Sequence, residues 1–238
     1  MMSLHSATPS PASATPSHSA TPSPASACGE ALAAAAIAVA TRIASGATLW
    51  AVAPGLDDHA RHVAVEFLHP VVVGTRSVPA VALTGANLIG RARRGCRVGD
   101  VAVLVGPETA EFAARCRVWG VVTVALTWGD VAVARQATHV VRLGGEADAV
   151  RAYHLLWELT QVCLEHAGLL EPAPPGAMCA VCADDAVLGE VVDLCDDQVT
   201  LLTPCGIVTA DATLVADLTV DDLVLVHAGI VIGRERIA

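Results

Sequence analysis

Between residues 47 and 143 the chain alternates short, continuously apolar segments with helical ones, and this alternation constrains the fold more than any other feature. Strands are expected at ATLWAVA, VPAVAL, DVAVLVG, VVTVALT and THVVRL, with helices before, between and after them. Strands that are apolar on both faces and joined by helices form a parallel sheet covered on each side. The sequence therefore predicts an α/β domain over residues 29–170, a three-layer αβα parallel-sheet fold of the flavodoxin-like kind.

The segments outside this domain have different compositions. Residues 1–28 repeat HSATPSPASA and contain too few large apolar residues to fold, so they are expected to be a disordered tail. Residues 171–177 are rich in proline and predict a hinge. Beyond the hinge, apolar residues alternate with a period of two and are interrupted by acidic pairs and glycine. Residues 178–238 are therefore expected to form a small all-β barrel, similar to an OB-fold.

The charge of the chain excludes some classes of partner. Its formal net charge is -10, which is the wrong sign for a protein whose main partner is nucleic acid or an anionic membrane. Most of this charge lies beyond Cys179, where eleven Asp and Glu face two Arg, a difference of -9. No segment has the pattern of a signal peptide or the ~20 apolar residues of a membrane span. We therefore expect a cytoplasmic protein whose eight cysteines are thiols.

Several segments of the α/β domain point to a known family. DDHARHVAVEF, VPAVALT, RVGDVAVLVG and WGVVTVALTWGD resemble the sugar isomerase (SIS) domain, most closely its phosphoheptose isomerase branch. The resemblance implies a homodimer and a polar site containing a His and a Glu one helical turn apart, which His62 and Glu66 match. His59 would lie on the same side, and the closing helix retains His154. The resemblance also implies that this domain holds either zinc or no metal.

The phosphate-binding loops of that family are altered here. Small residues in two loops allow backbone amides to approach a sugar phosphate. In this chain the first loop carries Asp57 and Asp58, and the second retains only the hydroxyl of Thr109. Carboxylates repel a phosphate. The SIS-like domain is therefore predicted to be degenerate and to have a structural or regulatory role, with His62, Glu66, His154 and Thr109 as a vestigial isomerase site.

Cys179 and Cys182 form a Cys-x2-Cys pair directly after the hinge. A zinc ribbon would need a second such pair, but Cys195 and Cys205 are ten residues apart. A thioredoxin-like pair would open a helix that follows a strand, whereas this pair precedes a predicted strand. Two packed thiols would suit an apolar setting, but two Asp residues follow the pair closely and indicate exposure.

A fourth interpretation of the pair comes from the last sixty residues. MCAVCADDAVLGEVVDL and VDDLVLVHAGIVIG resemble the HypC/HybG/HupF family of nickel-iron hydrogenase maturation chaperones. The resemblance implies that Cys179 ligates, through a soft thiolate, the iron that carries carbon monoxide and cyanide. It also implies that His227 assists the metal and that Cys182 is a second ligand or a resolving thiol. The partners would be a HypD-type iron-sulfur scaffold protein and the precursor of the hydrogenase large subunit.

These resemblances together predict the function. The chain is expected to be a nickel-iron hydrogenase maturation chaperone that helps to assemble and deliver an Fe(CN)2CO centre, an assembly factor rather than an enzyme. The alternative is a metal-dependent isomerase of a sugar phosphate similar to sedoheptulose 7-phosphate, or a protein that binds such a sugar phosphate. In that alternative the barrel would be regulatory.

Overall fold

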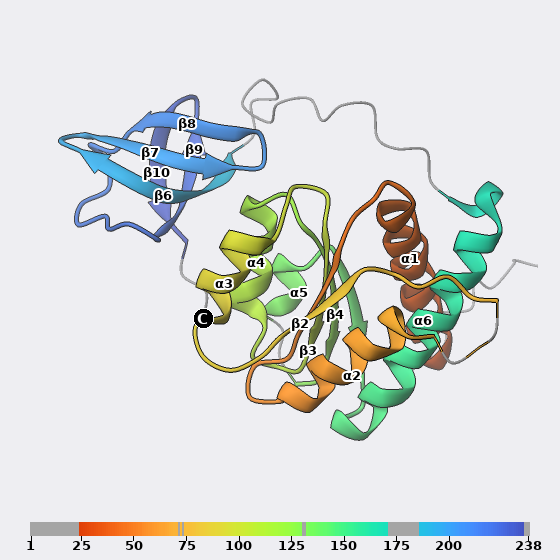
Figure 1. Cartoon of the computed structure of the whole chain (residues 1–238). Helices are drawn as coiled ribbons and strands as arrows, with labels where there is room; N and C mark the ends of the chain where they lie inside the picture. Colours follow the sequence, from red (N-terminus) through yellow and green to blue (C-terminus); the bar gives the residue numbers. More distant parts are fainter. Residues whose placement is uncertain (1–23, 71, 73, 130–131, 171–185, 236–238) are drawn as a thin grey trace, which may run out of the picture.

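The structure is a computed structural model that describes residues 24–70, 72, 74–129, 132–170 and 186–235 (Figure 1). An α/β domain is followed by a small β-barrel. The predicted hinge, the Cys179–Cys182 pair and the first 23 residues lie outside the described residues.

The α/β domain is built on a parallel sheet that has, among the described residues, five strands. These are β1 (Leu49–Val52), β2 (Ala80–Leu83), β3 (Val101–Val105), β4 (Val122–Thr127) and β5 (His139–Arg142). Their order is β2-β1-β3-β4-β5, and every neighbouring pair is parallel. This is the strand order of flavodoxin-like folds. The predicted parallel sheet is confirmed.

Helices cover both faces of this sheet (Figure 1). They are α1 (Pro24–Ala44), α2 (Asp57–Leu68), α3 (Leu88–Gly95), α4 (Ala110–Val118), α5 (Val133–Gln136) and α6 (Ala149–Glu165), with short 3-10 helices η1 (Glu146–Asp148) and η2 (Ala167–Leu169). Alternate residues of β3 show the two faces: Val103 packs with α1, α2 and α6, and Leu104 packs with α3, α4 and α5. The inner strands β1 and β3 are apolar throughout because both of their faces are covered, whereas the edge strand β5 carries His139 and Arg142.

One helix boundary differs from the sequence prediction. Helix α1 begins at Pro24, inside the segment 1–28 that was expected to be disordered. The fixed φ of proline suits the first helical position, and its missing N–H would have no partner there. Helix α4 begins at Ala110, after the chain turns at Gly106, where φ is +114°. None of the described helices is long and apolar enough to cross a membrane.

The C-terminal part forms a closed barrel that has, in the described residues, five strands. They are β6 (Val187–Cys195), β7 (Gln198–Thr203), β8 (Gly206–Asp211), β9 (Leu223–His227) and β10 (Ile230–Arg234). Their order is β10-β8-β7-β6-β9, and the parallel contact between β8 and β10 closes the barrel. Side chains such as Val191, Leu201 and Val224 fill its interior. The predicted all-β barrel is confirmed.

The barrel packs against α4 of the α/β domain, a contact that the sequence did not predict. Leu188 and Leu223 belong to the same buried cluster as Phe112 of α4. Glu190 of β6 is 1% exposed, and the Arg115 guanidinium donates to its Oε1 while Trp119 Nε1 donates to its Oε2 at 2.8 Å. Apolar residues and a buried ion pair thus join the two parts of the chain. We call this contact the seam.

Candidate metal-binding site

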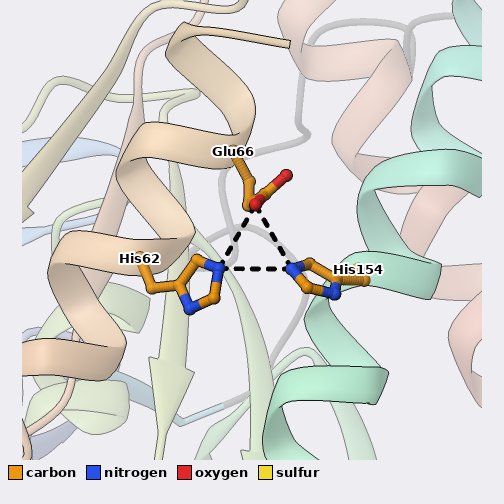
Figure 2. A group of neighbouring side chains, drawn as sticks. All are labelled: His62, Glu66 and His154. Carbon is orange, nitrogen blue, oxygen red and sulfur yellow. Dashed lines mark hydrogen bonds and ion pairs between the residues drawn. The ribbon is translucent and has the colours of Figure 1, made fainter. Parts of the chain in front are cut away.

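Helices α2 and α6 bring together the side chains of His62, Glu66 and His154 (Figure 2). His62 and Glu66 are one turn apart on α2 and therefore lie on the same helix face. His154 reaches them from α6. Nε2 of His62 lies 3.2 Å from Glu66 Oε1 and 3.2 Å from His154 Nε2, and His154 Nε2 lies 3.3 Å from Glu66 Oε1. Three possible ligand atoms therefore form a nearly equilateral triangle.

The dimensions of this triangle fit a tetrahedral metal ion. Zn²⁺ binds His nitrogen and carboxylate oxygen at about 2.0–2.1 Å, so two ligand atoms of a tetrahedral set lie about 3.3–3.4 Å apart. The three distances in this site are 3.2, 3.2 and 3.3 Å. Three protein ligands are also the number found in catalytic zinc sites, where the fourth position takes water or substrate.

The hydrogen-bonding capacity of the three groups also favours an ion. A neutral imidazole has one N–H and one lone pair, and a carboxylate oxygen only accepts. If both Nε2 atoms carried hydrogen, both could donate to Glu66, but the two N–H groups would then oppose each other across the contact between His62 and His154. If only one Nε2 atom carried hydrogen, its N–H could donate a good hydrogen bond to only one of its two neighbours in the triangle. A single cation can accept a lone pair from all three atoms at once.

Tyr153 supports the triangle from the side of the protein interior. Its side chain is almost fully buried, and its Oη lies 2.8 Å from His62 Nδ1. Burial, and to a smaller extent the nearby Glu66 carboxylate, raise the pKa of the Tyr153 phenol to about 12. The phenol therefore remains neutral at physiological pH. No sequence motif identified Tyr153, and its only signal was its position next to His154.

His59 does not join the triangle. The sequence pattern placed His59 on the same side as His62 and Glu66, but the third member of the group in the structure is His154. Nε2 of His59 instead faces Glu146 Oε1 of η1 at 3.4 Å. The reason is that His59 lies in the first turn of α2, near the segment that leads into α6.

A cavity of about 630 Å³ is lined by His59 and other residues at the start of α2, together with Gly85 after β2 and Glu146 of η1. Its lining includes three carboxylates and one guanidinium, those of Asp57, Asp58, Glu146 and Arg61. The Asp57 carboxylate accepts a hydrogen bond from the backbone N–H of Gly85, with N···O distances of 3.1 and 3.3 Å. A backbone donor that could face an anion is thus already bound by a carboxylate. The charge of this cavity disfavours a phosphate.

Thr109, the fourth member of the predicted vestigial site, lies apart from the triangle. Its side chain is fully buried, and its hydroxyl donates to the carbonyl oxygen of Gly106 at 3.3 Å. This hydroxyl is therefore satisfied inside its own loop. The structure brings together three of the four predicted residues: His62, Glu66 and His154.

The residues predicted to bind iron lie in the barrel or just before it. His227 ends β9 and is half-buried, and the chain turns into β10 through Ala228 and Gly229, which have φ values of 49° and 80°. Cys179 and Cys182 lie outside the described residues. Their predicted roles, and that of His227, stay predictions.

Comparison with known proteins identifies the fold of the α/β domain. No protein-family model and no curated protein matches the chain. A solved structure of a phosphoheptose isomerase from Francisella tularensis matches with a TM-score of 0.53 and 16% identity, over 58% of this chain and 89% of that one.

Two further structures match with lower TM-scores. A phosphoheptose isomerase from Neisseria gonorrhoeae matches at 0.46 with 20% identity, over 57% of this chain and 85% of that one. The sugar isomerase domain of an RpiR transcription factor from Sphaerobacter thermophilus matches at 0.39 with 21% identity, over 59% of this chain and 80% of that one. The likeness to the Francisella protein shows the fold: residues N-terminal to the barrel adopt the fold of a phosphoheptose isomerase, which is the SIS-like fold.

Proposed function

We propose that this chain is a nickel-iron hydrogenase maturation chaperone whose barrel receives and delivers an Fe(CN)2CO unit. Two features support this proposal. The sequence around Cys179 and His227 resembles the HypC/HybG/HupF family, and the segment that carries His227 belongs to a small closed barrel. The iron unit is cargo in this proposal, not a resident cofactor.

The observation that carries the proposal is the pairing of β6 with β9. Val187, the first residue of β6, pairs antiparallel with Val226, so the chain enters β6 beside His227, the last residue of β9. Cys182 and Cys179 precede Val187 by five and eight residues, which span at most about 17 Å and about 28 Å. A thiol in this segment is therefore within reach of the end of the barrel that carries His227.

The chemistry of these groups suits the proposed cargo. A cysteine thiolate is a soft ligand, which matches an iron that carries carbon monoxide and cyanide. We propose Cys179 as the iron ligand, His227 as an assisting group and Cys182 as a second ligand or resolving thiol. The partners would be a HypD-type scaffold protein and the large-subunit precursor, and the acidity of the barrel would favour basic surfaces on them.

Infrared spectroscopy tests the proposal. Tagged protein is purified from cells that express hydrogenase genes, and spectra are recorded in the region of cyanide and carbonyl stretching. We expect bands in the wild-type protein and their loss in Cys179→Ala. Cys205→Ala is the matched control, because Cys205 is an exposed thiol in the turn between β7 and β8 of the same barrel. Bands that persist in Cys179→Ala would refute the assignment of this ligand.

The triangle of His62, Glu66 and His154 favours a second candidate function, a metal-dependent isomerase of a sugar phosphate. The three residues would hold a zinc-like ion, which as a Lewis acid would supply polarisation of a carbonyl oxygen of a sugar. The likeness of the domain to a phosphoheptose isomerase supports this candidate. The carboxylates of Asp57 and Asp58 count against a phosphate in the adjoining cavity.

Metal analysis and two variants separate the two candidates. The second candidate requires about one zinc per chain, loss of zinc in His154→Ala, and turnover of sedoheptulose 7-phosphate that disappears in Glu66→Gln. If the chaperone proposal holds alone, Glu66→Gln matures hydrogenase normally and the wild-type protein shows no turnover. A severe maturation defect in folded Glu66→Gln would show that the α/β domain contributes chemistry to maturation.

A further inference from the structure

We propose that Tyr153 is a positioning residue of the candidate metal site: its phenol oxygen accepts a hydrogen bond from Nδ1–H of His62 and so directs the lone pair of Nε2 toward a divalent metal ion held with Glu66 and His154. This inference rests on the metal site of the second candidate function. It adds a residue that neither the sequence motifs nor the triangle itself includes.

The contacts of His62 lie on opposite sides of its ring. On one side Nδ1 is 2.8 Å from Tyr153 Oη, and on the other side Nε2 is 3.2 Å from both Glu66 Oε1 and His154 Nε2. The contact to Tyr153 is the shortest of the three. It fixes the rotation of the imidazole, and it can be made with the ring proton on either nitrogen, because a phenol can donate or accept.

A phenol at this position can form a hydrogen bond with either tautomer of the neutral His62 ring. When Nδ1 carries the proton, it donates to Tyr153 Oη and Nε2 has a free lone pair. When Nε2 carries the proton, it donates to Glu66 Oε1, and the Tyr153 hydroxyl turns to donate to Nδ1. The ring holds one proton in both states, and the outer hydrogen bond is kept in both, because a phenol can donate and accept. A carboxylate or a carbonyl, the common outer partners of metal-bound His, can only accept.

Tyr153 thus allows the site to exist with and without a metal ion. Without an ion, the second state satisfies Glu66 with a hydrogen bond from His62. When an ion takes the lone pair of Nε2, His62 changes to the first state without losing its bond to Tyr153. The phenol therefore orients His62 in both states and does not oppose metal binding.

The packing of Tyr153 allows the role of its hydroxyl to be tested separately from that of its ring. The ring packs edge-on against His59, His62 and His154, with centroid distances of 6.0, 5.0 and 5.2 Å. Phenylalanine keeps this packing and removes only the hydroxyl. Tyr153 is also the single tyrosine of the chain, so its spectroscopic signals are unambiguous.

The first measurement is zinc and cobalt affinity, obtained by competition with a chelator on the full chain. Outer-shell partners of metal ligands change metal affinity by about 10–100-fold, and we expect Tyr153→Phe to weaken binding by that factor. Thr160→Val is the matched control, since Thr160 is buried on the same helix and its hydroxyl donates to Leu156 O at 2.7 Å, away from the triangle. Its affinity should equal that of the wild type.

The second measurement is nitrogen NMR of histidine side chains in the zinc-loaded protein, which distinguishes positioning from packing. In the wild type we expect His62 to show a slowly exchanging Nδ1 proton with a nuclear Overhauser contact to the Tyr153 ring. In Tyr153→Phe this proton should exchange rapidly. The wild-type spectrum tests the hydrogen bond even if the variant fails to fold.

The outcomes separate this proposal from the one on which it rests. A wild-type protein that binds no zinc would refute the metal site and, with it, the role of Tyr153. Zinc binding that is equal in the wild type and Tyr153→Phe, or a zinc-loaded His62 without a protected Nδ1 proton, would refute the role of Tyr153 alone.

Discussion

Removal of the Glu190 carboxylate should detach the barrel from the α/β domain. Glu190 is 1% exposed, and its two oxygens accept hydrogen bonds from Arg115 and from the Trp119 indole. In Glu190→Ala the Arg115 guanidinium would remain in the seam without its main counter-charge. Arg115 Nε is already buried with no hydrogen-bond partner among the described residues. The carboxylates that would remain near the guanidinium, such as Glu111 and Asp221, are far more exposed than Glu190.

The magnitude follows from burial. Breaking a buried ion pair by removing one partner costs about 3–5 kcal/mol, because the other charge is left uncompensated. Arg115 has a second acidic neighbour, Glu111, at 3.3 Å, but the Glu111 side chain is 56% exposed. An exposed pair of this kind contributes about 0–1 kcal/mol. Glu111→Ala is therefore a matched control that removes a carboxylate from the same guanidinium.

Two assays measure the effect. In urea unfolding, Glu190→Ala should lose about 3–5 kcal/mol of stability or show a separate transition for the barrel, whereas Glu111→Ala should remain within about 1 kcal/mol of the wild type. Limited proteolysis should cut Glu190→Ala faster between the two parts of the chain. A Glu190→Ala protein that behaves like Glu111→Ala in both assays would show that the seam does not depend on this ion pair.

Three further predictions concern other parts of the molecule. Burial, and to a smaller extent the Asp100 carboxylate, raise the pKa of the Cys96 thiol to about 12. At pH 8 iodoacetamide should therefore modify the exposed Cys205 and leave Cys96 intact. Rapid labelling of Cys96 would contradict this prediction. The Cys96 thiol keeps its proton to a higher pH in the folded state than in the unfolded state. Its contribution to the free energy of unfolding should therefore be complete below pH ~8.5, where both states are protonated, and decrease as the pH rises above that value. Asp100→Ala should lower the free energy of unfolding by more than about 2 kcal/mol. The reason is that the Trp50 indole and the backbone amides of Thr48 and Arg97 would lose their common acceptor. A smaller loss in urea unfolding would mean that water replaces the carboxylate. Glu66→Gln should abolish zinc binding without changing the melting temperature of the metal-free protein by more than a few degrees, and retention of zinc would show that Glu66 is not a ligand.

Local patterns in the sequence predicted the elements, and long-range contacts explain what they missed. The parallel sheet followed from strands that are apolar on both faces, and the barrel followed from the change to a period of two after residue 178. His62 and Glu66 could be paired from their spacing on one helix. The hydrogen bond between Tyr153 and His62 joins residues 91 positions apart, and that between Arg115 and Glu190 joins residues 75 positions apart. Neither partner carries a local signal of the other.

The opposite placement of the seam and the triangle allows their roles to be tested independently. Helices α2 and α6, which carry His62 and Tyr153, cover one face of the sheet, and α4, which carries Arg115, covers the other face and packs against the barrel. Effects of distant substitutions that share no partner add within about 0.3–0.5 kcal/mol. The double variant Glu190→Ala/Tyr153→Phe should therefore lose as much unfolding free energy as the two single variants together, and its zinc affinity should equal that of Tyr153→Phe. A coupling energy above about 1 kcal/mol, or a zinc affinity that changes when the barrel detaches, would mean that the sheet transmits the state of one site to the other.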